Sequence, residues 1–162
     1  MAKTKFFFLI LLAGLLLINA CKKIDLYEKT VALPAHEWNS SYKPSFDFQI
    51  EDSTRTYELF FVCRHSDKYN FNNIIFRVTL TDPFGKTYSF DVEKQLGSND
   101  KGWLGVGMDD IYEHRISLNK ELLAAGISLK NKGNYSISLE QIMRENPLKQ
   151  VFNVGLRLER KN

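Results

Sequence analysis

Three neighbouring residues carry the side-chain types of a hydrolytic triad. His65, Ser66 and Asp67 would supply a base, a nucleophile and a carboxylate, the set that acyl transfer uses. A working triad brings such residues together from distant segments, so adjacency along the chain does not indicate one. We interpret the segment as a solvent-exposed loop. We predict no catalytic residues and no enzymatic activity.

Acidic residues and glycines lie close together between positions 102 and 113. Asp109, Asp110 and Glu113 could offer oxygen atoms to a cation, but they lack the ligand register of a calcium loop. The glycines of the run 102–107 are typical of bulges or of close backbone approach, and not of a phosphate-binding loop. None of the three histidines stands at metal-ligand spacing from another. We therefore predict no metal site.

Two segments combine the aromatic and basic side chains that carry binding energy at protein interfaces. The first holds Trp103, Tyr112 and Arg115, and its alternative is that Trp103 closes one end of the fold. The second holds Arg144 ahead of Pro147, and its alternative is a plain connection between two strands with a solvated arginine. We predict Trp103, Tyr112, Arg115 and Arg144 as partner-binding residues.

The first 20 residues have the features of a lipoprotein signal peptide. Lys3 and Lys5 precede the 13-residue apolar run Phe6–Ile18. A bilayer span needs about 20 residues, so this run suits a secretory signal instead. A small residue followed by cysteine resembles a bacterial lipobox, and we predict cleavage between Ala20 and Cys21, with covalent lipid on Cys21 and no other cofactor. The alternative is an ordinary signal peptide with a cysteine nearby.

Cysteine usage and charge agree with an envelope protein. With Cys21 lipidated, Cys63 is left alone in an apolar stretch, where we predict a buried, unreactive thiol. Residues 21–162 hold 20 basic and 19 acidic side chains, and no basic face indicates a nucleic-acid partner. Lys22 and Lys23 follow the cysteine directly, which favours an anchor in the outer membrane facing the periplasm. Three acyl chains would hold it there firmly.

Alternation of apolar and polar residues predicts a mainly β structure. The expected strands are 46–50, 57–64, 74–80, 88–92, 104–106, 116–118, 135–139 and 152–158. A turn at 82–85 joins the third and fourth of them, because Pro83 and Gly85 suit its backbone. One short helix is expected over Lys120–Ala125, with Asn119 as its cap.

About eight short strands in an all-β chain argue for an antiparallel β-sandwich. The order of the strands, jelly-roll or immunoglobulin-like, stays open. We predict a signal peptide over 1–20, a tether over 21–29 and a single β-sandwich domain over 30–162.

Short motifs spread over the mature chain are similar, in the same order, to those of the GldH family of gliding-motility lipoproteins from Bacteroidota. These motifs are Asp25-Leu26-Tyr27-Glu28 after Cys21, Trp38, Phe46-Asp47-Phe48, Arg64-His65 with Tyr69 and Asn73, Gly102-Trp103-Leu104-Gly105, Asp110 to Arg115, Glu140 to Arg144, Asn146-Pro147-Leu148, and Val154 to Arg157. The resemblance implies a membrane-anchored lipoprotein linked to the gliding and type IX secretion machinery, with envelope proteins as partners and no enzymatic activity.

Two other functions remain as alternatives. A periplasmic or surface glycan-binding lipoprotein would use exposed aromatic rings, for which Trp38, Trp103 and Tyr112 are the candidates. A hydrolase would need an acid pair or an activated nucleophile in a cleft, and the sequence nominates none. No small-molecule substrate is indicated.

Overall fold

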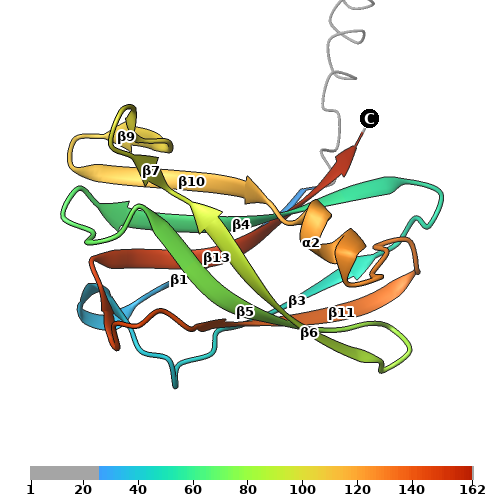
Figure 1. Cartoon of the computed structure of the whole chain (residues 1–162). Helices are drawn as coiled ribbons and strands as arrows, with labels where there is room; N and C mark the ends of the chain where they lie inside the picture. Colours follow the sequence, from blue (N-terminus) through green and yellow to red (C-terminus); the bar gives the residue numbers. More distant parts are fainter. Residues whose placement is uncertain (1–25, 162) are drawn as a thin grey trace, which may run out of the picture.

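Two antiparallel sheets face each other across a shared apolar core in the computed structural model, which describes residues 26–161 (Figure 1). The first sheet has the order β1 (Leu26–Ala32), β13 (Val151–Lys161), β4 (Thr56–Ser66), β10 (Ile111–Ser117) and β9 (Val106–Met108). The second has the order β3 (Ser45–Ile50), β11 (Gly133–Gln141), β5 (Asn73–Thr81) and β6 (Thr87–Gln95). The predicted all-β sandwich is confirmed.

Smaller elements connect the strands of the two sheets. β2 (Glu37–Trp38) pairs with β12 (Leu148–Lys149), and β7 (Gly97–Ser98) pairs with β8 (Gly102–Trp103). A 3-10 turn, η2 (Pro34–His36), and a short helix, α2 (Asn119–Ala124), complete the described part of the chain.

The strand order is that of a jelly roll. Taken in chain order, the longer strands are β1, β3, β4, β5, β6, β10, β11 and β13. The first, eighth, third and sixth of these lie side by side in one sheet, and the second, seventh, fourth and fifth in the other. Two interlocked Greek keys produce this order. The sequence had left the choice between a jelly-roll and an immunoglobulin-like order open, and the structure has the jelly-roll order.

The core lies between β4 and β5. Along β5 every second residue is buried, as alternation predicts for a strand with one face covered. Phe61 of β4 and Phe76 of β5 stack across the gap with ring centroids 4.2 Å apart. Cys63 is fully buried beside them, and burial raises the pKa of its thiol to about 12. The prediction of an unreactive core thiol is confirmed.

The predicted hairpin between β5 and β6 is confirmed, with the carboxylate of Asp82 organising its turn. Oδ1 of Asp82 accepts hydrogen bonds from the backbone N–H groups of Phe84 and Lys86, each at 2.9 Å. Gly85 has φ +81°, a conformation that glycine adopts without strain.

Several predicted boundaries were wrong. The tether is shorter than 21–29, because Leu26–Ala32 pairs with β13 and Tyr27 packs on the core. The strand expected at 104–106 is β9, which lies two residues later, and β10 begins at Ile111, five residues before the expected strand. The signal peptide, the cleavage site and Cys21 lie outside the described residues.

Asn119 does not cap the helix, because its side chain is already engaged with a strand. Its Oδ1 accepts a hydrogen bond from the backbone N–H of Leu59 in β4, at 3.1 Å. The N-cap is instead Leu118, which has no side-chain cap bond. The helix therefore begins where the chain leaves β10 and is fixed to β4, the central strand of the first sheet.

The long strands give the sandwich two ends, which we call proximal and distal (Figure 1). The proximal end holds Leu26 at the start of β1, Thr56 at the start of β4, Lys161 at the end of β13, and α2. The distal end holds Ser66 at the end of β4 and the turn between β9 and β10. The chain therefore enters the domain at the end opposite to the β9–β10 turn.

Candidate functional site

Two buried histidines meet at the distal end, on neighbouring strands of the first sheet. Nε2 of His65 in β4 lies 2.9 Å from Nε2 of His114 in β10. Nδ1 of His65 lies 2.7 Å from the carbonyl oxygen of Ser66, so this nitrogen carries the proton and donates to it. His114 must then donate through its own Nε2 to the free Nε2 of His65. Both rings are neutral in this arrangement.

Burial keeps the histidine pair neutral. It lowers the pKa of His65, and it lowers the pKa of His114 to about 4, with the neighbouring His65 as the second cause. His65 and Ser66 are both buried in β4, so the prediction of a solvent-exposed loop there was wrong. The hydroxyl of Ser66 donates a hydrogen bond to Oε1 of Gln150 at 2.9 Å, and not to a ring nitrogen of the histidine pair.

Aromatic rings surround the histidine pair and close the distal end of the core. Trp103 contacts His65 edge-on at 4.4 Å between ring centroids, and Tyr112 stacks on His65 at 5.9 Å. Tyr69 contacts both His65 and Trp103, and its hydroxyl donates to the carbonyl of Asn73 at 3.0 Å. Trp103 and Tyr112 are half-buried, so their rings serve mainly to pack this end of the sandwich.

The predicted partner-binding residues do not all lie together. Trp103 and Tyr112 share the aromatic cluster, and Arg144 is joined to it because its guanidinium lies 5.1 Å from the ring of Phe71, which contacts Tyr69. Arg115 lies on the opposite face of β10. Tyr112 and Arg115 are three positions apart on a strand, and residues an odd number apart point to opposite faces.

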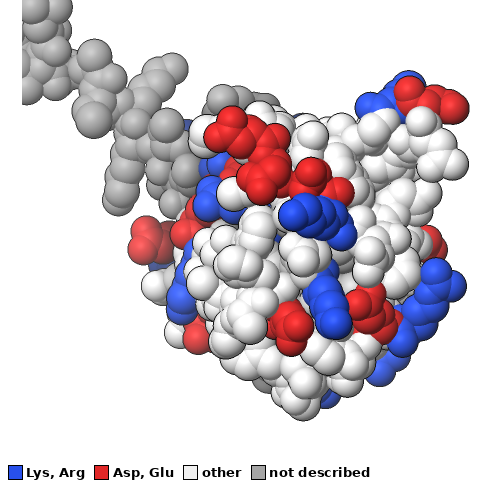
Figure 2. Space-filling view, turned by 90° about the vertical axis from the view of Figure 1, so that its left-hand side faces the viewer, with Lys and Arg blue, Asp and Glu red and all other residues white. Residues whose placement is uncertain are grey.

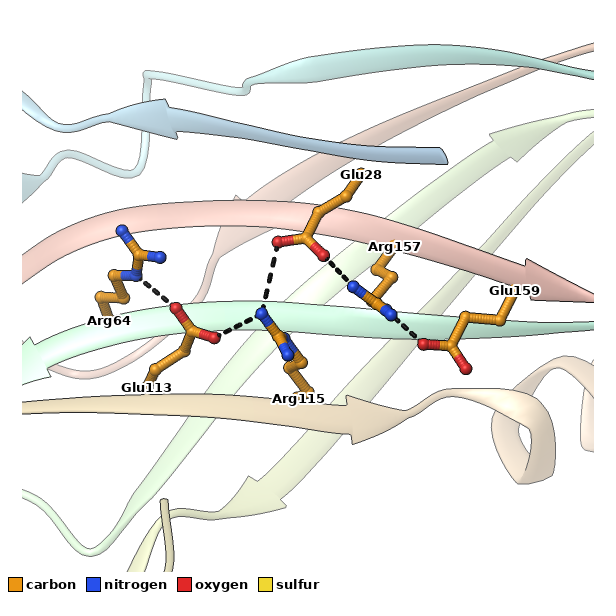
Figure 3. Close-up of polar contacts among 6 residues, drawn as sticks. All are labelled: Glu28, Arg64, Glu113, Arg115, Arg157 and Glu159. Carbon is orange, nitrogen blue, oxygen red and sulfur yellow. Dashed lines mark hydrogen bonds and ion pairs between the residues drawn. The ribbon is translucent and has the colours of Figure 1, made fainter. Parts of the chain in front are cut away.

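On the outer face of the first sheet, a row of ion pairs runs across four strands (Figure 3). Glu113 of β10 pairs with Arg64 of β4 and, at 2.9 Å, with Arg115. Arg115 also reaches Glu28 of β1 at 3.7 Å. Glu28 pairs in turn with Arg157 of β13, which also pairs with Glu159. The three arginines and three glutamates balance, so this row carries no net charge.

A hollow of about 680 Å³ lies beside one end of this row. Its charged lining comes from Arg64, Glu113 and Arg115 of the ion-pair row and from Asp109 and Asp110 of the β9–β10 turn. The apolar residues Val106, Met108 and Ile111 line it from β9 and β10, and Phe152 and His36 line it from β13 and η2. The hollow therefore combines apolar walls with a paired group of Arg64, Glu113 and Arg115 and with the exposed carboxylates of Asp109 and Asp110.

β9 is the outer strand of this sheet, and its side chains are unusually apolar for such a position. Val106 is 80% exposed and Met108 is 74% exposed, and both line the hollow. The other outer strands of the two main sheets, β1, β3 and β6, expose mainly polar side chains. Polar side chains on outer strands prevent unwanted pairing with other chains. Figure 2 looks onto this end, where much of the surface is uncharged and acidic and basic groups adjoin in several places.

Glycines allow β9 and the segment before it to lie close to β10. A Cβ atom on Gly105 would lie 2.6 Å from the carbonyl oxygen of Glu113 and 2.8 Å from Nε2 of His114. A Cβ atom on Gly107 would lie 2.9 Å from the ring of Tyr112. Gly105 and Gly107 therefore serve close backbone approach, as predicted, whereas Gly102 has open space beside it and adopts φ +67°.

The acidic residues of this end are not gathered at one point. Asp109 and Asp110 are exposed in the β9–β10 turn, whereas Glu113 is held by two arginines. Within residues 26–161, no group of three or more His, Cys, Asp or Glu side chains could hold a metal ion. Over the same residues, no helix is long and apolar enough to cross a membrane.

Sequence reasoning missed the histidine pair, Arg64, and the apolar side chains of β9. A signal for the pair was present, because His65 is two residues from Cys63 and His114 is two residues from Ile116. Each histidine thus shares the inward face of its strand with an apolar side chain. Trp38, one of the aromatic residues expected to be exposed, is fully buried, and its Nε1 donates to the carbonyl of Tyr42 at 2.9 Å.

Known proteins match the chain over almost its full length. Residues 25–158 match the family model described as GldH lipoprotein. A protein named gliding motility lipoprotein GldH homolog, from Christiangramia forsetii, is 26% identical to this chain. The match covers 98% of this chain and 98% of that protein. The gliding motility lipoprotein GldH of Flavobacterium johnsoniae is 28% identical, over 94% of this chain and 96% of its own length.

Similarity to solved structures is weaker. A cellulose-specific carbohydrate-binding module, CBM28, superposes with a TM-score of 0.44 at 11% identity, over 85% of this chain and 73% of its own.

Proposed function

The chain belongs to the GldH lipoprotein family, and from this we propose that it is a non-catalytic accessory of the gliding and type IX secretion machinery. In this proposal, lipid on Cys21 anchors the domain to the outer membrane, facing the periplasm. The distal end then binds an envelope protein of that machinery. The names of the family and of its curated members support the lipoprotein and motility parts of the proposal.

The observation that carries the binding role is the apolar outer strand β9 beside the charged hollow. An outer strand leaves backbone N–H and C=O groups without a strand partner on one side, and β9 adds exposed apolar side chains to them. Such a strand invites pairing with another chain, a recognised mode of protein binding. Val106 and Met108 would supply the apolar contact, and Ile111 extends it onto β10.

The charged lining of the hollow would give the contact its specificity. Arg64 and Arg115 share Glu113, whereas Asp109 and Asp110 line the same hollow as exposed carboxylates that a basic side chain of the partner could meet. Interface charges of this kind select partners and orient them more than they add affinity. Arg115, predicted from the sequence as a partner-binding residue, keeps that role here.

The chemistry of the buried groups supports a role without catalysis. The pKa of the Cys63 thiol, raised to about 12, leaves it protonated at neutral pH. Both ring nitrogens of His65 are hydrogen-bonded, Nδ1 to the carbonyl of Ser66 and Nε2 to Nε2 of His114. These rings therefore act as packing groups of the distal end.

The test replaces the apolar side chains of β9 by charge. Val106→Asp and Met108→Asp should abolish co-purification of motility or secretion proteins with the tagged lipoprotein after cross-linking in cells, and should impair spreading. Phe84→Asp is the matched control, because Phe84 is 77% exposed on the turn between β5 and β6, away from β9. If the β9 variants retain both partners and spreading, β9 is not the binding strand.

A further inference from the structure

The length of chain between the predicted lipid and the domain limits how the domain can lie. Cys21 and Leu26 are five residues apart, and a chain this short spans at most about 18 Å even when fully extended. Leu26 is the first residue of β1, at the proximal end. The lipid headgroups must therefore lie close to the proximal end, and the side chains exposed there are within reach of the membrane surface.

The segment 119–132, which we call the α2 platform, offers an apolar contact at this end. Leu123 on the outside of the helix is 78% exposed. Beside it a hollow of about 210 Å³ is lined by Leu122, Ile127 and Leu129 of the platform and by Thr56 and Tyr57 of β4. Tyr57 pairs with Arg160 near the end of β13, and β13 pairs with Leu26 through Glu159. The platform and the start of β1 therefore belong to the same end.

Basic charge surrounds Leu123. Lys120, Lys130 and Lys132 are exposed on the platform. The platform has one acidic residue, Glu121, and it is paired with Lys94 at 2.7 Å.

Other acids near this end are matched in a similar way. Asp52 pairs with Arg55, Glu58 pairs with Lys161, and Asp82 accepts the backbone bonds of its own turn beside Gly133, while Glu51 is exposed near the platform. An exposed leucine within a group of lysines is the composition of a surface that lies in the headgroup region of anionic lipids.

We propose that the α2 platform rests on the anionic lipid surface of the membrane that holds the anchor, with Leu123 inserted between headgroups. This inference rests on the proposed lipid attachment at Cys21 and adds an orientation to it. β4 runs from Thr56 to Ser66, and 11 residues of strand cover about 33 Å. Seating the proximal end would therefore hold β9 about that far from the lipid, facing the periplasmic space.

A fluorescent probe at single cysteines tests the orientation on the full lipidated protein. Cys21 would be acylated and Cys63 is buried, so a new cysteine at Leu123→Cys or Val106→Cys takes the label alone. Each protein is reconstituted into vesicles of phosphatidylglycerol and phosphatidylcholine with nitroxide-headgroup lipid as quencher. We expect strong quenching at position 123 and little at position 106, which is the matched control at the distal end.

The lysines are tested separately by Lys120→Gln, Lys130→Gln and Lys132→Gln in one chain. Each lysine near an anionic surface contributes about a fivefold factor to partitioning, so the triple variant should lose most of the quenching at position 123. High salt, or vesicles of phosphatidylcholine alone, should have the same effect.

Two results would overturn the inference in distinguishable ways. Equal quenching at positions 123 and 106, in a protein that floats with the vesicles, would refute the orientation and leave the anchor intact. A protein that does not float with the vesicles would refute lipid attachment at Cys21, and the orientation with it.

Discussion

Acidification should destabilise the domain through its buried histidine pair. The folded state holds the pKa of His114 at about 4, against an ordinary value of 6.5, because burial and the nearby His65 disfavour the charged ring. The unfolded chain therefore binds protons that the folded chain excludes. The stabilisation is present above pH 6.5 and is lost as the pH falls towards 4. For one imidazole, the free energy of unfolding falls by about 2 kcal/mol between pH 7 and pH 5.

Urea unfolding of the unlipidated chain (Cys21→Ser), followed by tryptophan fluorescence at pH 7, 6 and 5, measures this loss. The comparison is the double variant His65→Gln and His114→Gln, which cannot titrate at this position and should lose about 2 kcal/mol less. His36→Gln is the control for an exposed histidine and should behave as the parent chain. Equal losses in the parent and the double variant would refute the assignment of neutral, mutually bonded rings.

Two further substitutions test the packing of the fold, and a third tests the proposed binding face. Gly155→Ala should destabilise the domain by about 1–3 kcal/mol in thermal unfolding, because its Cβ would lie 2.2 Å from the carbonyl oxygen of Lys29; unchanged stability would contradict the close approach of β1. Gln141→Leu should cost about 2 kcal/mol in urea unfolding, since the buried amide bonds Met143 and Asn146; a neutral result would exclude that role. Arg115→Ala should change stability by less than about 1 kcal/mol and yet weaken partner capture, because its side chain is 48% exposed; a large loss of stability would contradict a binding role.

Most strands were predictable from sequence because they have one buried and one exposed face, whereas β4 is buried on both faces near its middle and β1 begins in the predicted tether. The alternation of Phe46, Phe48 and Ile50 identified β3, and the Pro83–Gly85 turn identified the hairpin of β5 and β6. The jelly-roll order was not predictable, since the pairing of β1 with β13 joins residues more than a hundred positions apart. Alternation says which face of a strand is buried, and not which strand lies beside it.

The candidate site was predicted only in part for the same reason. Trp103 and Tyr112 could be selected as candidates by residue type. Whether their side chains point into the core depends on which face of the strand each residue occupies, and residue type does not determine that. The pair of His65 and His114 exists only in the register that sets Cys63 opposite His114. Likewise, the hollow forms where η2 and β13 approach β9, three segments that are distant in sequence.

Photo-cross-linking in living cells is the direct test of the proposal that β9 binds an envelope protein. A benzophenone amino acid is placed at Met108 on β9, or at Ser89 on β6, an outer strand of the other sheet whose exposed side chains are polar. We predict a discrete cross-link from position 108 to a component of the motility or secretion machinery, and none from position 89. No cross-link at position 108, or the same product from both positions, would contradict the claim.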